Sequence, residues 1–223
     1  MKNKFFKDKS LFVLCFLFII VRLLILLTSP YLLDYEESRI GVITKEIIEG
    51  PKLPLWEYQS LFAAYQGGLI INGILIIPLF YIFGESGVVL KLLWLLTSLG
   101  ALIVLYLFLN KFFNKKLAVL TSLLIIFSPQ FYTIRSLTDP SVYNGAIFFT
   151  VLIMYLFYNV FFNNRQKFRD LALFGLVCGF ALFFEFSSLV MIFTSILFWY
   201  IFDKKFFLKK KFFIFIIFFL IGF

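Results

Sequence analysis

The chain has 223 residues, of which 62% are hydrophobic, 22% aromatic and only 15% charged, and its formal net charge is +9. This composition excludes a soluble globular enzyme, because a soluble surface of this size needs more polar groups. It also excludes a disordered chain and a disulfide scaffold. The positive charge does not indicate a nucleic-acid partner, because the basic residues stand in short clusters between long apolar runs. The sequence therefore predicts an integral membrane protein.

Several kinds of site are excluded by residues that the sequence lacks. It has no histidine, so a histidine general base and a histidine-ligated metal are impossible. Its two cysteines, Cys15 and Cys178, lie in separate apolar runs, and a disulfide between them is not expected. The glycine-rich fingerprints of nucleotide-binding loops are absent as well. We therefore expect no nucleotide-binding domain.

Transmembrane helices need about 20 consecutive apolar residues. The first span is predicted at residues 11–29, and it lacks the cleavage site of a signal peptide. The remaining apolar runs that we expect to form spans are residues 88–109, 117–132, 142–162, 171–202 and 212–223.

The last two runs need separate interpretations. The run 171–202 is long enough for two short helices, with a break near Glu185. The final run stops at Phe223 after 12 residues, which predicts that the chain is truncated at its C-terminus. We therefore expect residues 1–223 to form one transmembrane module with an all-α fold. This module would be a polytopic membrane helical bundle of about six spans plus a truncated one.

The apolar stretch 61–83 contains three glycines and a proline, so it either crosses the membrane or only dips into it. Cytoplasmic segments are enriched in Lys and Arg, and this rule decides between the two topologies. If the stretch does not cross, 15 of the 21 Lys and Arg lie in the cytoplasm together with the N-terminus. We therefore expect residues 30–86 to form an outer loop with amphipathic, juxtamembrane helices, followed by the remaining spans in 88–223.

The longest polar segment, Pro30–Ser60, belongs to this outer loop. A helix is expected over residues 34–49, because the pair Gly50-Pro51 stops it. Apolar residues recur along it at helical spacing, which predicts that one stripe of the helix lies on the membrane surface. This stripe consists of Ile40, Ile43 and Ile47.

Three carboxylates, those of Asp34, Glu36 and Glu37, stand at the start of this helix. Asp34 can cap the helix with Glu37 completing a capping box, and acidic side chains favour a helix N-terminus in general. Capping needs only one of them, however, and neighbouring carboxylates repel one another. The cluster is therefore also a candidate catalytic group.

A second polar segment, Gln130–Ser141, faces the same outer layer in this topology. Asp139 followed by Pro140 is a common helix start, and Arg135 is either a salt-bridge partner or an interfacial anchor. Because this segment shares its membrane face with the first carboxylate cluster, Asp139 and Arg135 are also candidate functional residues.

Arg22 is a charged residue inside the first span, about two turns below its outer end. Two interpretations stay open for it. Either its side chain reaches the interface, or it faces the interior of the bundle and an anionic partner. Glu185 has the same two possibilities.

The residues between the first span and Gly84 resemble a known family. They read Glu36-Glu37, Gly41, Ile47, Gly50, Leu53-Pro54, Tyr65-x-Gly67-x-Leu69 and Pro78-Leu79-Phe80-x-x-Phe83-Gly84. This pattern is similar to the amino-terminal half of the polytopic GT-C glycosyltransferases. The closest groups are the lipopolysaccharide-core glycosyltransferases and the branch of protein mannosyltransferases and aminoarabinose transferases. The resemblance covers the chain from Leu11 to Phe202, although the family usually has Asp-Glu where this chain has Glu36-Glu37.

The resemblance implies transfer of a sugar from a polyprenyl-phosphate donor to an acceptor glycan, lipid or protein. It places the reaction at the outer face of the cell membrane. A carboxylate has to take the proton of the acceptor, a role suited to Asp34 or Glu36, and Asp139 can share it or orient the acceptor. Cationic groups stabilise the leaving phosphate. The candidate substrate-binding residues are Glu37, Arg39, Lys52 and Arg135.

No metal site is assigned, although clustered carboxylates would suit Mg²⁺ or Mn²⁺. Membrane lipid is an expected partner and nucleic acid is not. The alternative functions are a polytopic transporter or lipid flippase and a non-catalytic membrane subunit. Transporters often show internal repeats, and none is visible in this chain, which favours the glycosyltransferase.

Overall fold

The computed structural model describes residues 8–28, 35–58, 67–138, 142–162, 167–205 and 209–223. Every regular element in these ranges is a helix, which confirms the predicted all-α fold. The α-helices are α1 (Lys9–Thr28), α2 (Tyr35–Glu49), α3 (Gly67–Phe83), α4 (Gly87–Phe112), α5 (Lys115–Ile126), α6 (Gln130–Arg135), α7 (Tyr143–Phe162), α8 (Phe168–Phe184), α9 (Ser188–Phe202) and α10 (Lys210–Gly222), and a short 3-10 helix, η2, spans Leu55–Glu57.

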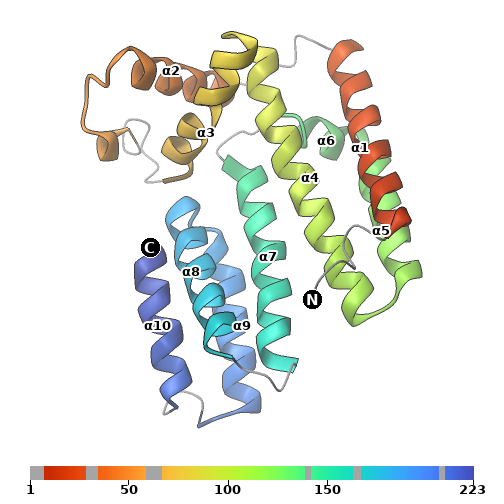
Figure 1. Ribbon diagram of the computed structural model, residues 1–223, viewed down its shortest axis with the longest axis vertical. Coiled ribbons are helices and arrows are strands. Elements are labelled where there is room, and N and C mark those ends of the chain that lie inside the picture. The colour runs from red at the N-terminus through yellow and green to blue at the C-terminus, as the bar shows by residue number, and fades with distance from the viewer. Residues whose placement is uncertain (1–7, 29–34, 59–66, 139–141, 163–166, 206–208) are drawn as a thin grey trace.

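Three of the described helices are long and apolar enough to cross a membrane. They are α1, α4 and α7, with 20, 26 and 20 residues. α4 packs against α1, α5 and α7, while α8 packs against α7, α9 and α10. The long helices stand side by side as a bundle (Figure 1). The chain is therefore an integral membrane protein with a helical-bundle fold.

The two ends of the bundle differ in what they carry. α1 ends and α4 begins at one end, where α2, α3 and the start of α7 also lie; we call it the loop end (Figure 1). Because the chain leaves α1 and enters α4 at the same end, α2 and α3 together add no net crossing of the bundle. The opposite end holds the links from α4 to α5, α7 to α8 and α9 to α10. We call it the basic end, since the described Lys and Arg residues at positions 9, 111–116, 167–169, 204–205 and 209–211 lie at or next to these helix ends.

Asp8 joins three helices at the basic end. Its carboxylate accepts hydrogen bonds from the Tyr106 hydroxyl on α4 and from Lys115 Nζ on α5, both at 2.8 Å. It also accepts a bond of 3.2 Å from the backbone N–H of Ser10 at the start of α1. These bonds fix the start of α1 against the turn between α4 and α5.

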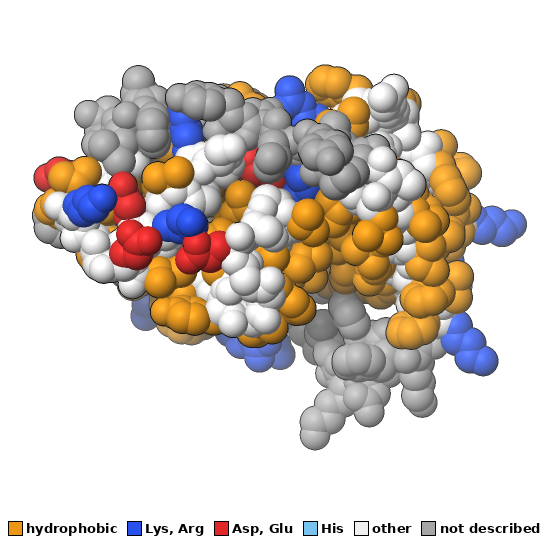
Figure 2. Space-filling view, turned by 90° about the horizontal axis from the view of Figure 1, so that it is seen from above, with side chains coloured by type: hydrophobic (Ala, Val, Ile, Leu, Met, Phe, Trp, Pro, Cys, Tyr) orange, Lys and Arg blue, Asp and Glu red, His pale blue; other side chains and the backbone are white. Residues whose placement is uncertain are grey.

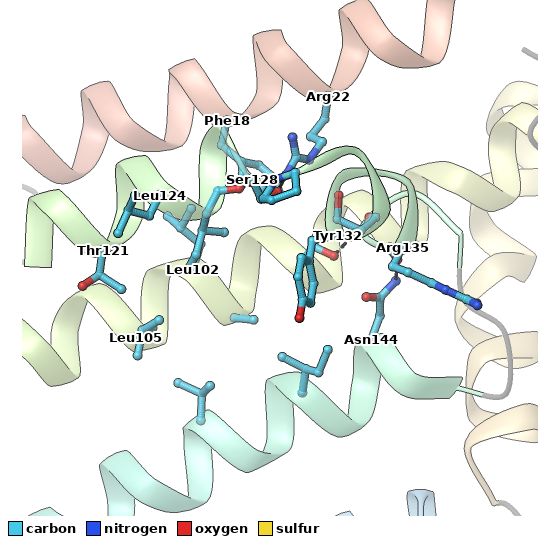
Figure 3. Close-up of a pocket in the computed structure, with 17 residues that line it drawn as sticks. Phe18, Arg22, Leu102, Leu105, Thr121, Leu124, Ser128, Tyr132, Arg135 and Asn144 are labelled. Atoms are coloured by element: carbon cyan, nitrogen blue, oxygen red, sulfur yellow. Dashed lines mark hydrogen bonds between the residues drawn. The ribbon is translucent and has the colours of Figure 1, made fainter. Parts of the chain in front are cut away.

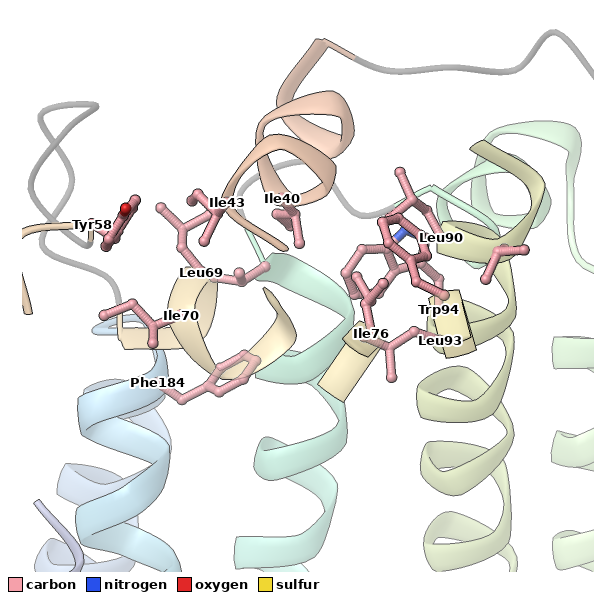
Figure 4. Close-up of a cluster of buried hydrophobic side chains, with 13 residues drawn as sticks. Ile40, Ile43, Tyr58, Leu69, Ile70, Ile76, Leu90, Leu93, Trp94 and Phe184 are labelled. Atoms are coloured by element: carbon pink, nitrogen blue, oxygen red, sulfur yellow. The ribbon is translucent and has the colours of Figure 1, made fainter. Parts of the chain in front are cut away.

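A hydrophobic core at the loop end fastens α2 to α3 and α4 (Figure 4). Ile40 and Ile43 of α2 are buried in it, together with Leu69 of α3 and Trp94 of α4. The prediction that this isoleucine stripe lies on the membrane surface is therefore wrong. The stripe faces protein because α3 and α4 supply the apolar surface that it covers.

Helix ends follow the local sequence at several expected points. α2 ends at Glu49, and Gly50 follows with φ of 112°, a conformation that suits glycine. The break expected near Glu185 separates α8 from α9.

One boundary differs from the expectation. The run 117–132 is not one span, because α5 ends at Ile126 and α6 starts after Pro129. Proline disfavours helical geometry in the residue before it, which explains the interruption. α7 begins at Tyr143, one residue after the start of the predicted run 142–162.

Candidate functional site

A cavity of about 420 Å³ lies toward the loop end of the bundle, over α4 and between α5 and α7 (Figure 3). Its volume is within the range of small-molecule sites. The polar residues that line it are Arg22, Ser98, Thr121, Ser128, Tyr132, Arg135, Ser136 and Asn144. The apolar ones are Phe18, Ala101, Leu102, Leu105, Leu124, Ile125, Pro129, Ile147 and Val151.

The cavity is open sideways between α5 and α7. Two of its lining residues, Leu124 on α5 and Ile147 on α7, are 65% and 56% exposed. Ile147 lies on α7, which is long and apolar enough to span a membrane, so in a bilayer this side of the cavity rim faces lipid. The cavity can therefore be reached from the membrane.

Arg22 provides a cationic group on the α1 side of this cavity (Figure 3). The side chain is 1% exposed, so it faces the interior of the bundle and does not reach the interface. Its Nη1 donates to the carbonyl of Ile126, and its Nη2 donates to the carbonyl of Ile125, each at 3.0 Å. A weaker bond of 3.3 Å joins Nη2 to the Ser128 hydroxyl. Of the two positions that the sequence left open for Arg22, the structure shows the interior one, with neutral groups as the described partners.

The segment around α6 forms the polar end of the cavity. Asn144 on α7 fastens it, because its Nδ2 donates to the carbonyls of Arg135 at 2.8 Å and Thr138 at 3.0 Å. Arg135 itself is exposed and lies over the ring of Phe131, with its Cζ 5.4 Å from the ring centroid. Its side chain extends away from Arg22, whereas Tyr132 points into the space between α4 and α7 (Figure 3).

Glu37 lies apart from this cavity and is fully buried. Its Oε2 accepts a hydrogen bond of 2.9 Å from Lys91 Nζ, and its Oε1 accepts one of 2.7 Å from Trp94 Nε1. Both partners belong to α4 and are also fully buried. Both oxygens of Glu37 are thus occupied by protein groups.

The other candidates from the first loop lie at the loop end or outside the described residues. Arg39 is half-buried on α2, and Lys52 is exposed after it, with its backbone N–H donating to the Tyr58 hydroxyl at 3.1 Å. Asp34 and Asp139 lie outside the described residues. Glu36 is in α2, but its side chain lies outside the described part of the structure.

Seen from above, the loop end has charged side chains gathered on one side of the face and a larger hydrophobic area beside them (Figure 2). An exposed ion pair of 2.6 Å joins Lys45 of α2 to Glu85 before α4. The carboxylate of Glu85 holds the pKa of Lys45 above its usual value. The charged part of the loop end therefore includes residues that precede α3 in the sequence and residues that follow it.

The described side chains do not assemble a metal site. Within the described ranges, no three Asp, Glu or Cys side chains come together in a way that could hold a metal ion.

Lys91, Trp94 and the cavity were not singled out from the sequence. A signal for Lys91 was present, because it is a charged residue inside the apolar run 88–109. Charges in such runs are costly to bury and usually have a specific partner. No comparable signal existed for the cavity, since its walls come from helices far apart in the sequence.

Comparison with known proteins identifies a family. Neither curated proteins nor solved structures give a match. Residues 73–223, more than half of the chain, match the family described as dolichyl-phosphate-mannose-protein mannosyltransferase. The match includes the cavity helices α4, α5 and α7 and the segment from Arg135 to Pro140, while the Glu36-Glu37 pair lies before it. The chain thus belongs to the dolichyl-phosphate-mannose-protein mannosyltransferase family, whose members are membrane glycosyltransferases of the GT-C type.

Proposed function

We propose that the protein transfers a sugar from a polyprenyl-phosphate-linked donor to an acceptor glycan, lipid or protein at the outer face of the cell membrane. The observation that carries this proposal is the cavity between α5 and α7, because it combines apolar walls, a lateral opening and a cationic end. A lipid-linked donor has the matching shape, with a chain that extends into the bilayer and an anionic headgroup. The family match supports the sugar-transfer chemistry.

The charge distribution supports the membrane orientation. The basic end contains most of the Lys and Arg, which favours a cytoplasmic location for it and for the N-terminus. The loop end then faces outward. With this orientation the segments that flank Asp34 and Asp139 meet the same aqueous layer, and the cavity lies in the outer part of the membrane.

The proposed reaction is a substitution at the anomeric carbon of the sugar. The acceptor hydroxyl attacks this carbon, the bond between it and the phosphate oxygen breaks, and polyprenyl phosphate leaves with the bonding electrons. The proton of the hydroxyl passes to a carboxylate, for which Asp34 and Glu36 are the candidates. Asp139 orients the acceptor, and Arg135, Arg39 and Lys52 are the candidates for contact with the leaving phosphate.

Glu37 is assigned a supporting role in this proposal. Because both of its oxygens bond to α4, it fixes the start of α2 relative to the bundle. Glu36 is the adjacent residue in the same helix. Glu37 is therefore a positioning residue for the first-loop carboxylates and not a group that contacts substrate.

Substitution of the candidate carboxylates tests the proposal. Asp34→Asn, Glu36→Gln and Asp139→Asn are compared with wild type in the full-length protein, using a polyprenyl-phosphate sugar carrying a radiolabel. We expect at least one of the first-loop variants to lose transfer by about 100-fold or more, the magnitude usual for a general base. Glu46→Gln on α2 is the matched control, and its activity should stay at the wild-type level.

Two results would contradict the proposal. Full activity in both Asp34→Asn and Glu36→Gln would remove the first loop from the mechanism. Movement of the labelled lipid across the membrane without sugar transfer would instead assign the protein to the transporter or flippase class.

A further inference from the structure

We infer that Arg22 binds the phosphate group of a polyprenyl-phosphate lipid in the cavity between α5 and α7. The inference rests on the proposed function and adds a residue that the sequence did not assign to the site. It begins from the charge of Arg22, which lies inside a membrane-spanning helix and is 1% exposed.

The described partners of Arg22 are all electrically neutral. Its hydrogen bonds go to two backbone carbonyls and one hydroxyl, and its Cζ lies 5.0 Å from the centroid of the Phe18 ring. No carboxylate in the described ranges forms an ion pair with it. Its Nε is buried and donates to no described atom. The carbonyls at the end of α5 carry only a partial negative charge, which offsets part of the arginine charge. Among the described residues, this buried cation therefore has no full counter-charge.

Lys91 shows how the same bundle treats another buried cation. It is as deeply buried as Arg22, and its Nζ is paired with the Glu37 carboxylate at 2.9 Å. Burying a charge is costly unless an opposite charge accompanies it. Arg22 differs from Lys91 in that a cavity is adjacent to it where Lys91 has a carboxylate. The missing anion is therefore expected to come from a ligand in that cavity.

The surroundings of Arg22 favour the phosphate group of a lipid over a free anion. Most of the cavity wall is apolar, and the exposed Leu124 and Ile147 leave it open toward the lipid. Ser128 adds a hydroxyl group at the cationic end, whereas the Tyr132 hydroxyl points into the space between α4 and α7. A guanidinium group binds phosphate with several aligned donors, whereas a free hydrated anion would gain little from apolar walls. Arg135 extends away from this position (Figure 3), so Arg22 is the better-placed cation.

The competing explanation is that Arg22 only caps the end of α5. Arg22→Gln separates the two roles, because glutamine keeps a donor for a carbonyl and removes the charge. Arg22→Lys keeps the charge. Lys111→Gln is the matched control, since Lys111 is a cation at the basic end whose hydrogen bond also goes to a neutral group, the Asn159 side chain.

Binding is measured on the full chain in nanodiscs of zwitterionic lipid. The probes are a radiolabelled polyprenyl phosphate, the uncharged polyprenol of the same length, and inorganic phosphate. We expect wild type to bind the polyprenyl phosphate at least about tenfold more tightly than the polyprenol, and Arg22→Gln to weaken phosphate-lipid binding by about 10- to 100-fold. Arg22→Lys should keep part of the preference, and Lys111→Gln should keep all of it.

The outcomes distinguish this inference from the proposed function. If Arg22→Gln bound the phosphate lipid as tightly as wild type does, Arg22 would only cap the end of α5. The proposed class of donor would be unaffected by that result. Equal wild-type affinity for phosphate lipid and polyprenol would contradict the proposed function itself. If wild type bound inorganic phosphate as tightly as polyprenyl phosphate, the inference that the anion belongs to a lipid would be overturned. If Arg22→Gln does not fold, Leu105→Trp fills the cavity without changing Arg22, and undiminished lipid binding by that variant would also overturn the inference.

Discussion

The ammonium group of Lys91 donates a hydrogen bond of 2.9 Å to the carboxylate of Glu37, and both side chains are fully buried. The pair joins α2 to α4, and Trp94 Nε1 occupies the second oxygen of Glu37 at 2.7 Å. A buried ion pair is not an efficient source of stability, because desolvation offsets much of the attraction. Its value here lies in fixing the position of α2, whose first turn contains Glu36.

Removing one partner of this pair should strongly destabilise the fold. Glu37→Gln leaves the Lys91 charge buried without its counter-charge, and we expect the free energy of unfolding to fall by about 3–5 kcal/mol. Thermal unfolding in detergent measures this loss. The double variant Glu37→Gln/Lys91→Met should lose less than Glu37→Gln alone, because it removes the uncompensated charge.

The exposed pair between Lys45 and Glu85 is the control for this prediction. Its side chains are 50% and 43% exposed, and solvent screens their attraction. Lys45→Met should leave the unfolding midpoint unchanged. Equal effects of Lys45→Met and Glu37→Gln would contradict the importance assigned to burial.

The Asp8 cluster at the basic end should make stability depend on acid pH. Burial of Asp8 acts to raise the pKa of its carboxyl, but hydrogen bonds from Lys115, Tyr106 and Ser10 outweigh it and lower this pKa below 3.8. A carboxyl whose pKa is lower in the folded state stabilises the fold at any pH above its pKa in the unfolded state. This contribution disappears as the pH falls through the pKa of the folded state. Wild type should therefore be more stable than Asp8→Asn at pH 7, and the difference should vanish in strong acid. A difference that grows on acidification would contradict this assignment.

Glu185 should show the opposite pH dependence. It lies in the turn between α8 and α9, is 6% exposed, and its Oε2 has no hydrogen-bond partner among the described residues. Burial raises the pKa of this carboxyl above 4.5, while bonds from Ser187 only partly oppose the shift. The fold consequently loses stability as the pH rises above 4.5.

Glu185→Gln should therefore raise the unfolding midpoint at pH 7 by about 2–4 °C, corresponding to about 1 kcal/mol. The gain should shrink as the pH falls toward 4.5 and disappear well below it, where the wild-type carboxyl is protonated in both states. A thermal scan at several pH values measures both effects. A variant that is less stable than wild type at pH 7 would indicate that the charged carboxylate has a favourable partner.

Close packing of α8 against α10 predicts a strong effect at Gly179. A Cβ atom added there would collide with the backbone carbonyl of Phe219, which cannot move aside as a side chain can. Gly179→Ala should lower the free energy of unfolding by about 1–3 kcal/mol. Gly100→Ala is the control, because its Cβ would meet only the ring of Phe148, at 3.1 Å. A loss of the same size in both variants would contradict the backbone contact.

Much of the secondary structure was predictable because membrane helices require long apolar runs. The pair Gly50-Pro51 predicted the end of α2 at Glu49, and Glu185 in the last long apolar run marked the break between α8 and α9. What the apolar stripe with Ile40 contacts was not predictable, since an apolar helix face can pack against either lipid or protein. The run 117–132 was predicted as one helix because it is apolar throughout, although Pro129 inside it indicates the interruption that the structure shows.

The site was less predictable because its parts are distant in the sequence. Glu37 contacts Lys91 and Trp94 across 54 and 57 residues, and local patterns do not determine which helices meet. Arg22 could be noticed as a charge in a span, but its direction depends on how α1 meets α5. Asp34 and Asp139 remain predictions, since both lie outside the described residues.

Photolabelling tests the central claim most directly. A polyprenyl phosphate with a photoreactive group in its polyprenyl chain is bound to the full-length protein and irradiated, and the attached residues are identified by mass spectrometry. We predict labels on the cavity walls, at Leu105 of α4, Leu124 of α5 and Val151 of α7, that decrease when unlabelled polyprenyl phosphate competes. Labels confined to α8, α9 and α10, or labels that do not decrease on competition, would contradict the assignment of this cavity to the lipid-linked donor.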